Sequence, residues 1–567
     1  MKLTTKFLRD QIIGNDTFFN TPYGSRLMTY ADYTASGRTL AFIEKYLISI
    51  QKYYANTHTE DSFTGKTMTD ILQRAEETIK KCLNANDNNY LIPVGTGVTG
   101  AIAKLCEILG IYLTPSLKYN IHSILNSESR EHIDIIKTFV ESNNENKPVI
   151  FLSPYEHHSN YLIWHECLAD VIEIQLNNQG EMDINDLITQ LTKYKDRIKI
   201  CSFSAASNIT GLKSNVYELA RIVHRHDGLI FYDFAASGPY VEINMNLDDE
   251  AYFDAIFLSP HKFIGGPGSS GLLVIHQKLY NSLYPPTVAG GGTVNYVSPY
   301  FYDFSPVVEA REKAGTPGIL QILKASLALE LKESIGVKKI QAIEEHYTKK
   351  ALEKLRSHPN IEILGPIDYK KRIGIISFNI KYQDKYLHHK FVTKLLNDLF
   401  GIQSRAGCAC AGPYGHRLLS INQQKAYKIR KAVMNGMNCI KPGFVRVNFH
   451  YLFDEIEVDY MLECISFIAS YGYLFLTQYN LNLKTGSWEH YAYQKEQTIE
   501  FNLNQSLQLN DDVFKKQFLN RFSLYQYYLD EAYKMLSILN YEIDPYLQKF
   551  TNQGYEQLRW FPFIMSK

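Results

Sequence analysis

Net charge is the first property that this sequence lacks. Its 567 residues include 59 Lys and Arg and 59 Asp and Glu, so the formal net charge is zero. A neutral chain has no general electrostatic attraction for nucleic acid or for an anionic membrane. We therefore expect neither as a partner.

Cysteine and long hydrophobic runs are also scarce. The eight cysteines are irregularly spaced, which excludes a disulfide framework and predicts reduced thiols and a cytoplasmic location. The most apolar stretch, Cys464–Leu476, is too short and too interrupted by Ser and Gly to span a bilayer. At the N-terminus, Met1–Ile13 mixes charged and apolar residues and so lacks the core of a signal peptide.

What is present is the composition of a globular protein, with 45% hydrophobic and 21% charged residues. At roughly 100–200 residues per domain, the length suggests about three domains. Short apolar runs in the first half alternate with segments of helical periodicity, such as Thr99–Leu109 and Val216–His224. The runs are Tyr90–Val94, Val149–Leu152, Ile198–Phe203, Leu229–Tyr232, Ala255–Leu258 and Gly271–Ile275. This alternation predicts an α/β fold with a mainly parallel sheet, whose ligands collect at the carboxyl ends of the strands.

The second half has a different pattern. It predicts the helices Leu320–Glu333, Ile340–Leu355 and Asp454–Ala469 and the strands Ile361–Leu364 and Ile375–Phe378. We interpret this part as a second, α+β domain. Beyond Asn480 the chain is rich in aromatic residues, Gln and Asn, and Asp512–Leu539 is predicted to be helical.

Chemically useful residues follow the predicted strands. Gly95–Gly100 is glycine-rich and precedes a helix, which suits an anion site or a plain strand-to-helix turn. His157 and His158 follow Val149–Leu152, where they would be acid–base groups, stacking partners, metal ligands or parts of a polar loop. Adjacent histidines do not easily bind one metal ion, and no Cys or His partner at metal spacing follows. We therefore predict no metal site.

Two charged residues complete a recognisable chemistry. Asp233 ends an apolar strand, where it would meet a cation or cap a helix. Lys262 follows Ala255–Leu258 and precedes several glycines, where it would form a Schiff base or lie on a surface loop. A lysine for an imine, a carboxylate for a pyridinium nitrogen and an anion site together favour pyridoxal 5'-phosphate as cofactor.

Five motifs, in this order along roughly residues 25–475, resemble the class V aminotransferase family, and within it the cysteine desulfurase and selenocysteine lyase branch. They are Glu156-His157-His158-Ser159-Asn160, Asp233, Ser259-Pro260-His261-Lys262, Ala314-Gly315-Thr316-Pro317 and Arg446-Val447-Asn448-Phe449. The resemblance implies the fold-type-I architecture of pyridoxal-phosphate enzymes. We expect a large domain with a mainly parallel seven-stranded sheet, a smaller α+β C-terminal domain and a helical tail. The expected division is 1–28, packing on the small domain, 29–300, 301–480 and 481–567.

The resemblance also implies a role for each matching position. Lys262 would hold the cofactor as a Schiff base and move the Cα proton, while Asp233 would pair with the ring nitrogen and His157 would stack on the ring. Asn208 would lie near the ring hydroxyl and the substrate carboxylate, which Arg446 would bind. The phosphate would be bound by Thr96, Gly97, Ser259 and His261, and Thr316 would reach the phosphate of a neighbouring subunit, which implies a homodimer.

The loop Ser404–Pro413, named the cysteine loop, contains a candidate catalytic nucleophile. Cys410 resembles the desulfurase nucleophile; without the resemblance, half a zinc site or two inert residues are alternatives. The implied reaction converts L-cysteine or selenocysteine to alanine, leaves a persulfide on Cys410 and passes its sulfur to a protein acceptor. Cys408 would relay sulfur, resolve a disulfide or do nothing.

The chain departs from the family pattern at two places. Ala236 stands where the family usually has a glutamine, with Ser237 or Asn208 as substitutes, and the segment Asn56–Thr59 lacks the usual basic residue. Other functions of the same fold are therefore open: an aminotransferase, an epimerase, a molybdenum-cofactor sulfurase-like protein or a non-catalytic scaffold.

Overall fold

The computed structural model describes residues 3–57, 59–125, 147–493, 499–508, 514, 517, 519–539 and 541–564. The chain forms two compact units. Unit 1 comprises Met1–Phe42, Asn208–Leu212 and Lys338–Lys567, and unit 2 comprises Ile43–Ser207 and Lys213–Val337. The four-part division expected from the sequence stays a prediction.

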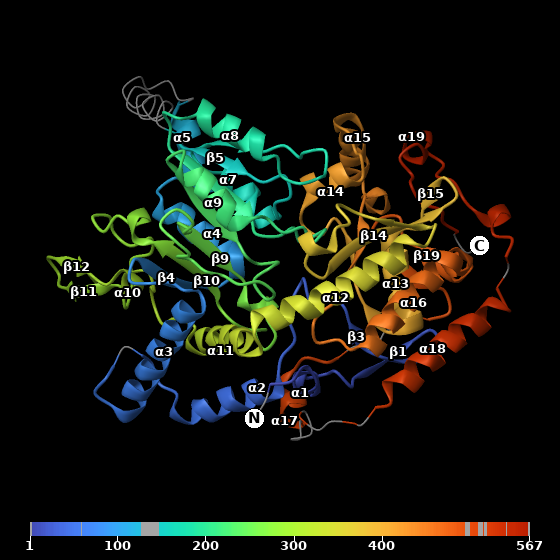
Figure 1. The fold of residues 1–567 in the computed structure, drawn as a ribbon, viewed down its shortest axis with the longest axis horizontal. Coiled ribbons are helices and arrows are strands. Elements are labelled where there is room, and N and C mark those ends of the chain that lie inside the picture. Colours follow the sequence, from blue (N-terminus) through green and yellow to red (C-terminus); the bar gives the residue numbers. More distant parts are fainter. Residues whose placement is uncertain are drawn as a thin grey trace. The chain divides into compact units, whose positions relative to one another are not determined.

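Unit 2 is built on a seven-stranded sheet (Figure 1). Its strands, in spatial order, are β4 (Asn89–Val94), β10 (Gly271–His276), β9 (Ala255–Leu258), β8 (Gly228–Asp233), β7 (Lys199–Ser204), β5 (Val149–Leu152) and β6 (Asp170–Glu173). Neighbours from β6 to β9 pair in parallel, whereas β10 runs antiparallel to β9 and β4. The expected seven-stranded, mainly parallel sheet is confirmed.

These strands form because both of their faces are covered, which favours continuous apolar runs. Ile150, Phe231, Phe257 and Leu273 are fully buried in one core cluster with helix α4 (Gly97–Ile108). Other helices of the unit are α3 (Phe63–Cys82), α5 (Pro115–Leu125), α8 (Ile184–Lys193), α9 (Val216–His224) and α11 (Ile319–Ile335), with α11 packed along α3. The predicted strands and helices of this half are thus confirmed, with boundaries shifted by only a few residues.

Unit 1 contains an antiparallel sheet in the order β13 (Ile361–Ile363), β14 (Ile375–Tyr382), β18 (Phe444–Asn448) and β17 (Arg405–Gly407), with β15 (Lys385–Tyr386) beside β14. Its helices include α12 (Val337–Arg356), α13 (His389–Phe400), α14 (Gly412–Leu418), α15 (Gln423–Met434) and α16 (Glu455–Tyr471). The segment Glu455–Gln478 is long and apolar enough to cross a membrane, but 67% of its most apolar window is buried inside the protein, as in a core helix.

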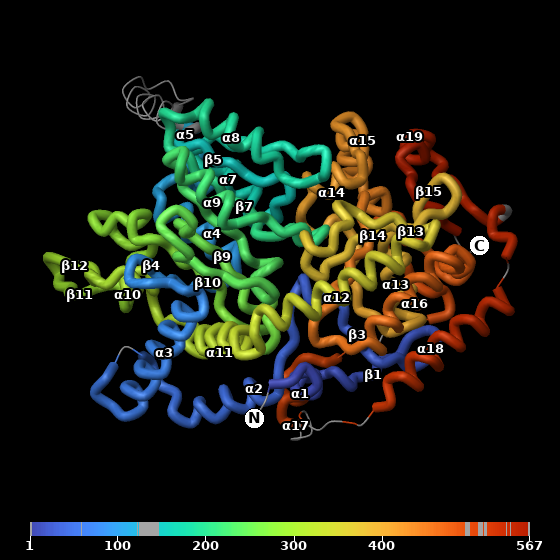
Figure 2. Tube along the Cα trace, viewed as in Figure 1, coloured from blue at the N-terminus to red at the C-terminus, as the bar shows by residue number. Residues whose placement is uncertain are grey.

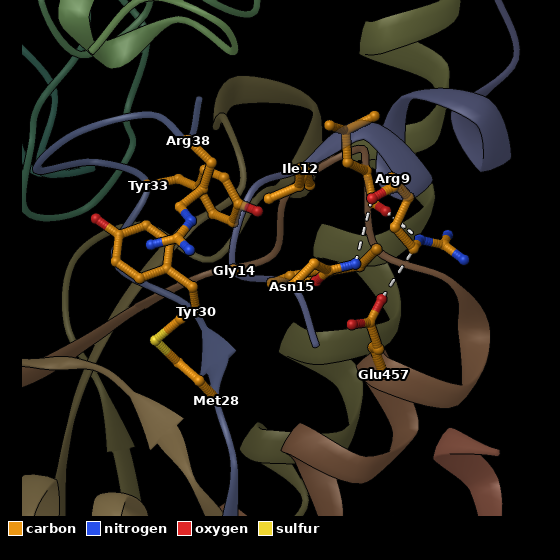
Figure 3. Close-up of a pocket in the computed structure, with 11 residues that line it drawn as sticks. Arg9, Ile12, Gly14, Asn15, Met28, Tyr30, Tyr33, Arg38 and Glu457 are labelled. Carbon is orange, nitrogen blue, oxygen red and sulfur yellow. Dashed lines mark hydrogen bonds and ion pairs between the residues drawn. The ribbon is translucent and has the colours of Figure 1, made fainter. Parts of the chain in front are cut away.

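The N-terminal segment belongs to unit 1. Helix α1 (Thr5–Gln11) precedes the hairpin β1 (Phe18–Thr21)–β2 (Gly24–Leu27), and β3 (Thr29–Tyr30) pairs in parallel with β16 (Ile402–Gln403). Arg9 binds Asp454 and reaches Glu457 at 3.6 Å. Figure 3 shows the small cavity beside Arg9 and Glu457. Its volume of about 10 Å³ leaves room for one water at most, so it is not a ligand site.

The C-terminal extension is part of unit 1, and Figure 2 shows its path at the red end of the chain. Its described elements are β19 (Tyr479–Leu481), β20 (Trp488–His490), α17 (Leu503–Gln508), α18 (Arg521–Leu536) and α19 (Gln553–Glu556). From α18, the Tyr528 hydroxyl accepts from Leu27 N–H at 2.9 Å, and Trp560 stacks on His388 at 5.1 Å. Helix α18 confirms the main part of the predicted helix Asp512–Leu539, of which 512–513, 515–516 and 518 lie outside the described residues.

Candidate active site

The predicted Schiff-base lysine lies in a turn that its neighbours fix tightly. β9 ends at Leu258, and Pro260–Lys262 form a single 3-10 turn in which Lys262 N–H donates to Ser259 O at 3.0 Å. A Cβ on Gly266 would lie 1.8 Å from Pro260 O, so only glycine lets the chain fold back here. Lys262 itself is half-buried. The backbone hydrogen bond and the close approach at Gly266 therefore fix the backbone conformation around Lys262.

Asp233 ends the neighbouring strand β8 and is buried. Burial raises the pKa of this carboxyl, whereas the N–H of Ala235, which donates to Oδ1 at 2.7 Å, and the charge of Lys262 lower it. A buried carboxylate that is only partly compensated is suited to a cationic partner such as a protonated ring nitrogen.

The start of α4 and the lysine turn come together. Val98 N–H donates to Ser259 Oγ at 3.0 Å, and Gly97 has a φ of +56°. A Cβ on Gly97 would lie 2.7 Å from Ser259 Oγ. Burial, and then the charge of Lys262, lower the pKa of His261 to about 4, so its ring is neutral at pH 7. Unpaired N–H groups at a helix start, a hydroxyl and a neutral imidazole suit a phosphate.

His157 lies in the loop after β5, and hydrogen bonds fix its ring. Ser159 N–H donates to His157 Nδ1 at 3.1 Å, and the Ser159 and Thr99 hydroxyls are 2.7 Å apart, which connects this loop to α4. The adjacent Glu156 is fully buried and accepts from four donors: Ser153 Oγ, Ser204 N, Ser204 Oγ and Asn160 Nδ2. Burial raises the pKa of Glu156 to about 7 against the effect of these donors.

Thr316 is in a different setting from the other predicted phosphate ligands. It is exposed in the loop before α11, and its hydroxyl accepts from Asn56 Nδ2 at 3.2 Å. The flanking Ala314 and Pro317 line a cavity of about 740 Å³ together with Gly95. The glycine-rich turn and the Thr316 loop thus border one open space of unit 2.

In unit 1, Arg446 is buried on the sheet strand β18. Its Nη1 donates to Asn208 O at 3.0 Å and its Nη2 to Asp32 Oδ1 at 2.8 Å. Burial lowers the pKa of Arg446, and the charge of Asp32 raises it. Within the described ranges, Arg446 Nε and Asn208 Oδ1 are buried without a hydrogen-bond partner. A carboxylate has the acceptors that such a guanidinium lacks.

The cysteine loop includes β17, and Cys410 lies in the turn after this strand. Cys410 is exposed, and Ala409 and Cys410 have φ angles of +48° and +56°, a left-handed conformation that is uncommon for these residue types. Asn208 Nδ2 donates to Ala409 O at 2.6 Å. Cys408, in contrast, donates its thiol to Pro442 O at 3.0 Å, and burial raises its pKa to about 11.

The predicted residues thus form two sets. Unit 2 brings together Gly97, Ser259, His261, Lys262 and Asp233, with Thr96 at the start of α4, His157 in the next loop and Thr316 in the exposed loop. Unit 1 brings together Asn208, Arg446 and the Cys410 loop. The sequence predicts neither Asp32 nor the hydrogen-bond network of Glu156. Glu156 lies in a recognised motif that assigns it no role, and no local pattern indicates that Asp32 meets an arginine 414 residues away.

These residues fit pyridoxal phosphate. In the part of the chain that the structure describes, Ser237 Oγ is a further buried group without a partner, next to Ala236. It could serve the ring hydroxyl in place of the missing glutamine. Gly271 lets β10 pack directly on the start of α4, since a Cβ on Gly271 would lie 2.5 Å from Gly97 Cα.

Comparison with known proteins agrees with this geometry. The model of the family described as aminotransferase class-V matches residues 126–461, more than half of the chain. A relative from Halalkalibacterium halodurans, named "Probable cysteine desulfurase", is 26% identical over 394 residues, which are 69% of this chain and 85% of the relative. A relative of the same name from Staphylococcus aureus is 26% identical over 412 residues, or 71% and 88%.

Solved structures show the same fold. A cysteine desulfurase from Thermococcus onnurineus in its apo form has a TM-score of 0.61 at 21% identity, covering 83% of this chain and 100% of that one. A cysteine desulfurase from Escherichia coli has a TM-score of 0.58 at 18% identity, covering 82% and 98%. With its seven-stranded sheet, its lysine turn and the family match over residues 126–461, the chain belongs to the class V aminotransferase family.

Proposed function

We propose that the chain is a pyridoxal-phosphate-dependent cysteine desulfurase that converts L-cysteine, or selenocysteine, to alanine and leaves a persulfide on Cys410. One observation carries the proposal: Asn208 binds both Arg446, through its carbonyl, and the loop of Cys410, through its side-chain amide. A carboxylate-binding arginine and an exposed thiol therefore share one positioning residue. The named relatives of 26% identity support the same activity.

The cofactor would be held by residues of unit 2. Lys262 would bind it covalently, Asp233 would pair with its ring nitrogen, and His157 would stack on the ring. Its phosphate would lie against Thr96, Gly97, Ser259 and His261. When bound, pyridoxal phosphate supplies an electron sink that stabilises negative charge on the substrate Cα.

Arg446, Lys262 and Cys410 would bind the substrate, move its proton and accept its sulfur. Arg446 Nε, buried and unpartnered within the described ranges, would bind the substrate carboxylate together with Asn208. Lys262 Nζ would take the Cα proton. The thiolate of Cys410 would attack the substrate sulfur, so that an S–S bond forms and the Cβ–S bond breaks. The electron pair of the broken bond stays on the carbon fragment, and its protonation gives alanine, so no external oxidant is needed.

We also propose a homodimer. The hairpin β11 (Val294–Val297)–β12 (Tyr302–Phe304) of unit 2 exposes a cluster of large apolar side chains, among them Tyr300, which is 83% exposed, and Phe301, which is 71% exposed. Exposed apolar clusters of this kind mark interaction surfaces. In a dimer of this family, Thr316 would reach the partner subunit's phosphate. All eight cysteines lie in the described residues and are free thiols, which suits the proposed cytosolic location.

The test is alanine release from L-cysteine by the cofactor-loaded protein, with Cys410→Ala as the matched control. We expect alanine and a protein persulfide from the wild type and neither from the variant, while both proteins absorb as imines. Release of a keto acid with conversion to the pyridoxamine form would instead identify an aminotransferase. Racemised substrate would identify an epimerase, and full biological activity of Lys262→Ala would identify a scaffold.

A further inference from the structure

Helix α15 follows the cysteine loop almost directly. Helix α14 begins at Gly412, two residues after Cys410, and a short turn after Leu418 leads to Gln423, where α15 begins. A helix of seven residues is about 10 Å long, so α15 begins near the thiol that would carry the persulfide. Figure 1 shows α15 standing out from its unit beyond α14.

The charge of this part of the chain is one-sided. The whole sequence is neutral, yet between Asp398 and Asp454 it contains no Asp or Glu and eight Lys and Arg. Four of these cations lie on α15, and all four are exposed: Lys425, Lys428, Arg430 and Lys431. None of the four forms an ion pair with another described residue. A region of unneutralised positive charge thus lies beside the cysteine loop.

The same helix also exposes apolar groups. Ile429 and Ala432 are buried and face the unit, whereas Tyr427 and Met434 are 54% and 74% exposed. Tyr427, Lys431 and Met434 have the spacing i, i+4, i+7 and share one face, and Lys431 Nζ lies 4.8 Å from the centre of the Tyr427 ring. Aromatic and methionine side chains bordered by cations are typical of protein interfaces.

We propose that these residues form a docking surface for an acidic protein that carries the acceptor thiol. The surface, named the α15 surface, comprises Lys425, Tyr427, Lys428, Arg430, Lys431 and Met434. The proposal rests on the proposed function, because it needs the persulfide on Cys410. Positive charge attracts an acidic partner and speeds its encounter. Transfer of the persulfide sulfur needs an acceptor thiol, which a protein can supply and nucleic acid ordinarily lacks.

The transfer step balances without an oxidant or reductant. The acceptor thiolate attacks the outer sulfur of the Cys410 persulfide, and a new S–S bond forms on the acceptor. The bond between the two sulfurs on Cys410 breaks, and Cys410 leaves as a thiolate, ready for the next substrate. The proton of the persulfide stays on the outer sulfur.

Two synthetic peptides test the surface. Each has one cysteine, followed in one peptide by six glutamates and in the other by six serines, and each rate is corrected for the peptide's reactivity toward a small disulfide. With cofactor-loaded enzyme and L-cysteine at low salt, we expect sulfur transfer to the glutamate peptide to be about tenfold faster. The difference should shrink at 0.5 M NaCl, because salt screens exposed charges.

Charge-reversal variants test whether the preference for the glutamate peptide arises at the α15 surface. We expect K428E/K431E to abolish the preference for the glutamate peptide, and the matched control K338E/K339E, on exposed positions of α12, to keep it. Alanine release with dithiothreitol as acceptor should be normal in both variants.

The proposal would be overturned by equal rates for the two peptides, by a preference that survives K428E/K431E, or by loss of alanine release in that variant alone. Stronger inhibition by polyuridine RNA than by hexaglutamate at equal charge would overturn it in favour of a nucleic acid. A wild-type enzyme that releases no alanine refutes the proposed function itself, and the alanine assay with dithiothreitol shows this without either peptide.

Discussion

The lysine turn of unit 2 and the cysteine loop of unit 1 hold their reactive groups in opposite ways. Lys262 follows a buried strand, its turn is closed by backbone hydrogen bonds, and Gly266 lies where a Cβ would meet backbone. Cys410 is exposed, in left-handed backbone, and Asn208 provides the side-chain hydrogen bond to the preceding residue. The first arrangement fixes a group in place, and the second leaves it accessible.

The difference fits two kinds of chemistry. A lysine that moves a proton needs a fixed distance and a controlled environment, because proton transfer depends steeply on geometry. A cysteine that accepts sulfur from one molecule and gives it to another must reach both, so exposure is a requirement. Variants that disturb each region should therefore fail in different assays.

Lys262→Ala should have the largest effect. Loss of the amine removes both the covalent attachment and the proton carrier, so alanine release should fall by a factor on the order of 10²–10⁴ or more. The imine absorbance should disappear while the circular dichroism spectrum is retained. An unchanged absorbance spectrum would refute the Schiff-base role.

Alanine substitutions at Gly266 and Gly407 compare the two regions directly. At Gly266 the new Cβ would clash with Pro260 O, so the lysine turn must shift, and we expect a loss of cofactor occupancy together with about 1–3 kcal/mol of stability. At Gly407, with a φ of +111°, no described atom lies within 4 Å of the new Cβ, so the cost is backbone strain of about 1–3 kcal/mol.

The measurement is the cofactor content after dialysis, with thermal unfolding as the stability control. Gly407→Ala should retain its cofactor, and Gly266→Ala should lose most of it. Equal retention in both variants would show that the lysine turn is no more constrained than the cysteine loop.

The sequence predicts the central strands of unit 2 well because burial on both faces makes them uniformly apolar. It fails for β6 (Asp170–Glu173), an edge strand that carries charged residues at both ends and no apolar run. The antiparallel direction of β10 was not predicted either, since an apolar run does not encode the direction of its pairing. Helices α14 and α15 were missed because α15 has only a narrow buried face, around Ile429 and Ala432.

For the candidate site, the sequence predicts residues that lie in local motifs and misses those defined by distant pairing. Lys262 and Asp233 are recognisable because each lies at the carboxyl end of an apolar strand. Asp32 is not, because only folding brings it to Arg446. The role of Glu156 is hidden in part for the same reason: Ser153 and Asn160 lie in its own segment, but Ser204, whose N–H and hydroxyl supply the other two hydrogen bonds, is 48 residues away.

Glu156→Gln, in unit 2, should alter how the free energy of unfolding depends on pH. The folded pKa of Glu156 is about 7, above its ordinary value of 4.5. Between these pH values the folded protein keeps a proton that the unfolded chain releases, so stability falls as pH rises through this window, by at most about 3 kcal/mol. Because glutamine does not titrate, the variant does not lose stability in this way as the pH rises.

The difference in melting temperature, variant minus wild type, should therefore become more positive from pH 5 to pH 8, even though Gln replaces one acceptor by a donor. Glu77→Gln, at an exposed position of α3, controls for the loss of one negative charge. A difference that is the same at every pH would mean that the four donors, and not burial, determine the pKa of Glu156.

Cys408→Ser should have the smallest effect, although Cys408 is only two residues from the proposed nucleophile. Because burial raises its pKa to about 11, Cys408 is a protonated thiol at pH 8, and a thiol is a poor nucleophile. Serine keeps the hydrogen bond to Pro442 O, so the base of the loop should be unchanged. We expect alanine release within about twofold of the wild type and a persulfide that mass spectrometry still finds on Cys410. If the persulfide forms but no longer reaches an acceptor, Cys408 relays the sulfur. Exposure at Cys410 would then serve only to receive sulfur, and the buried neighbour would be the group that gives it away.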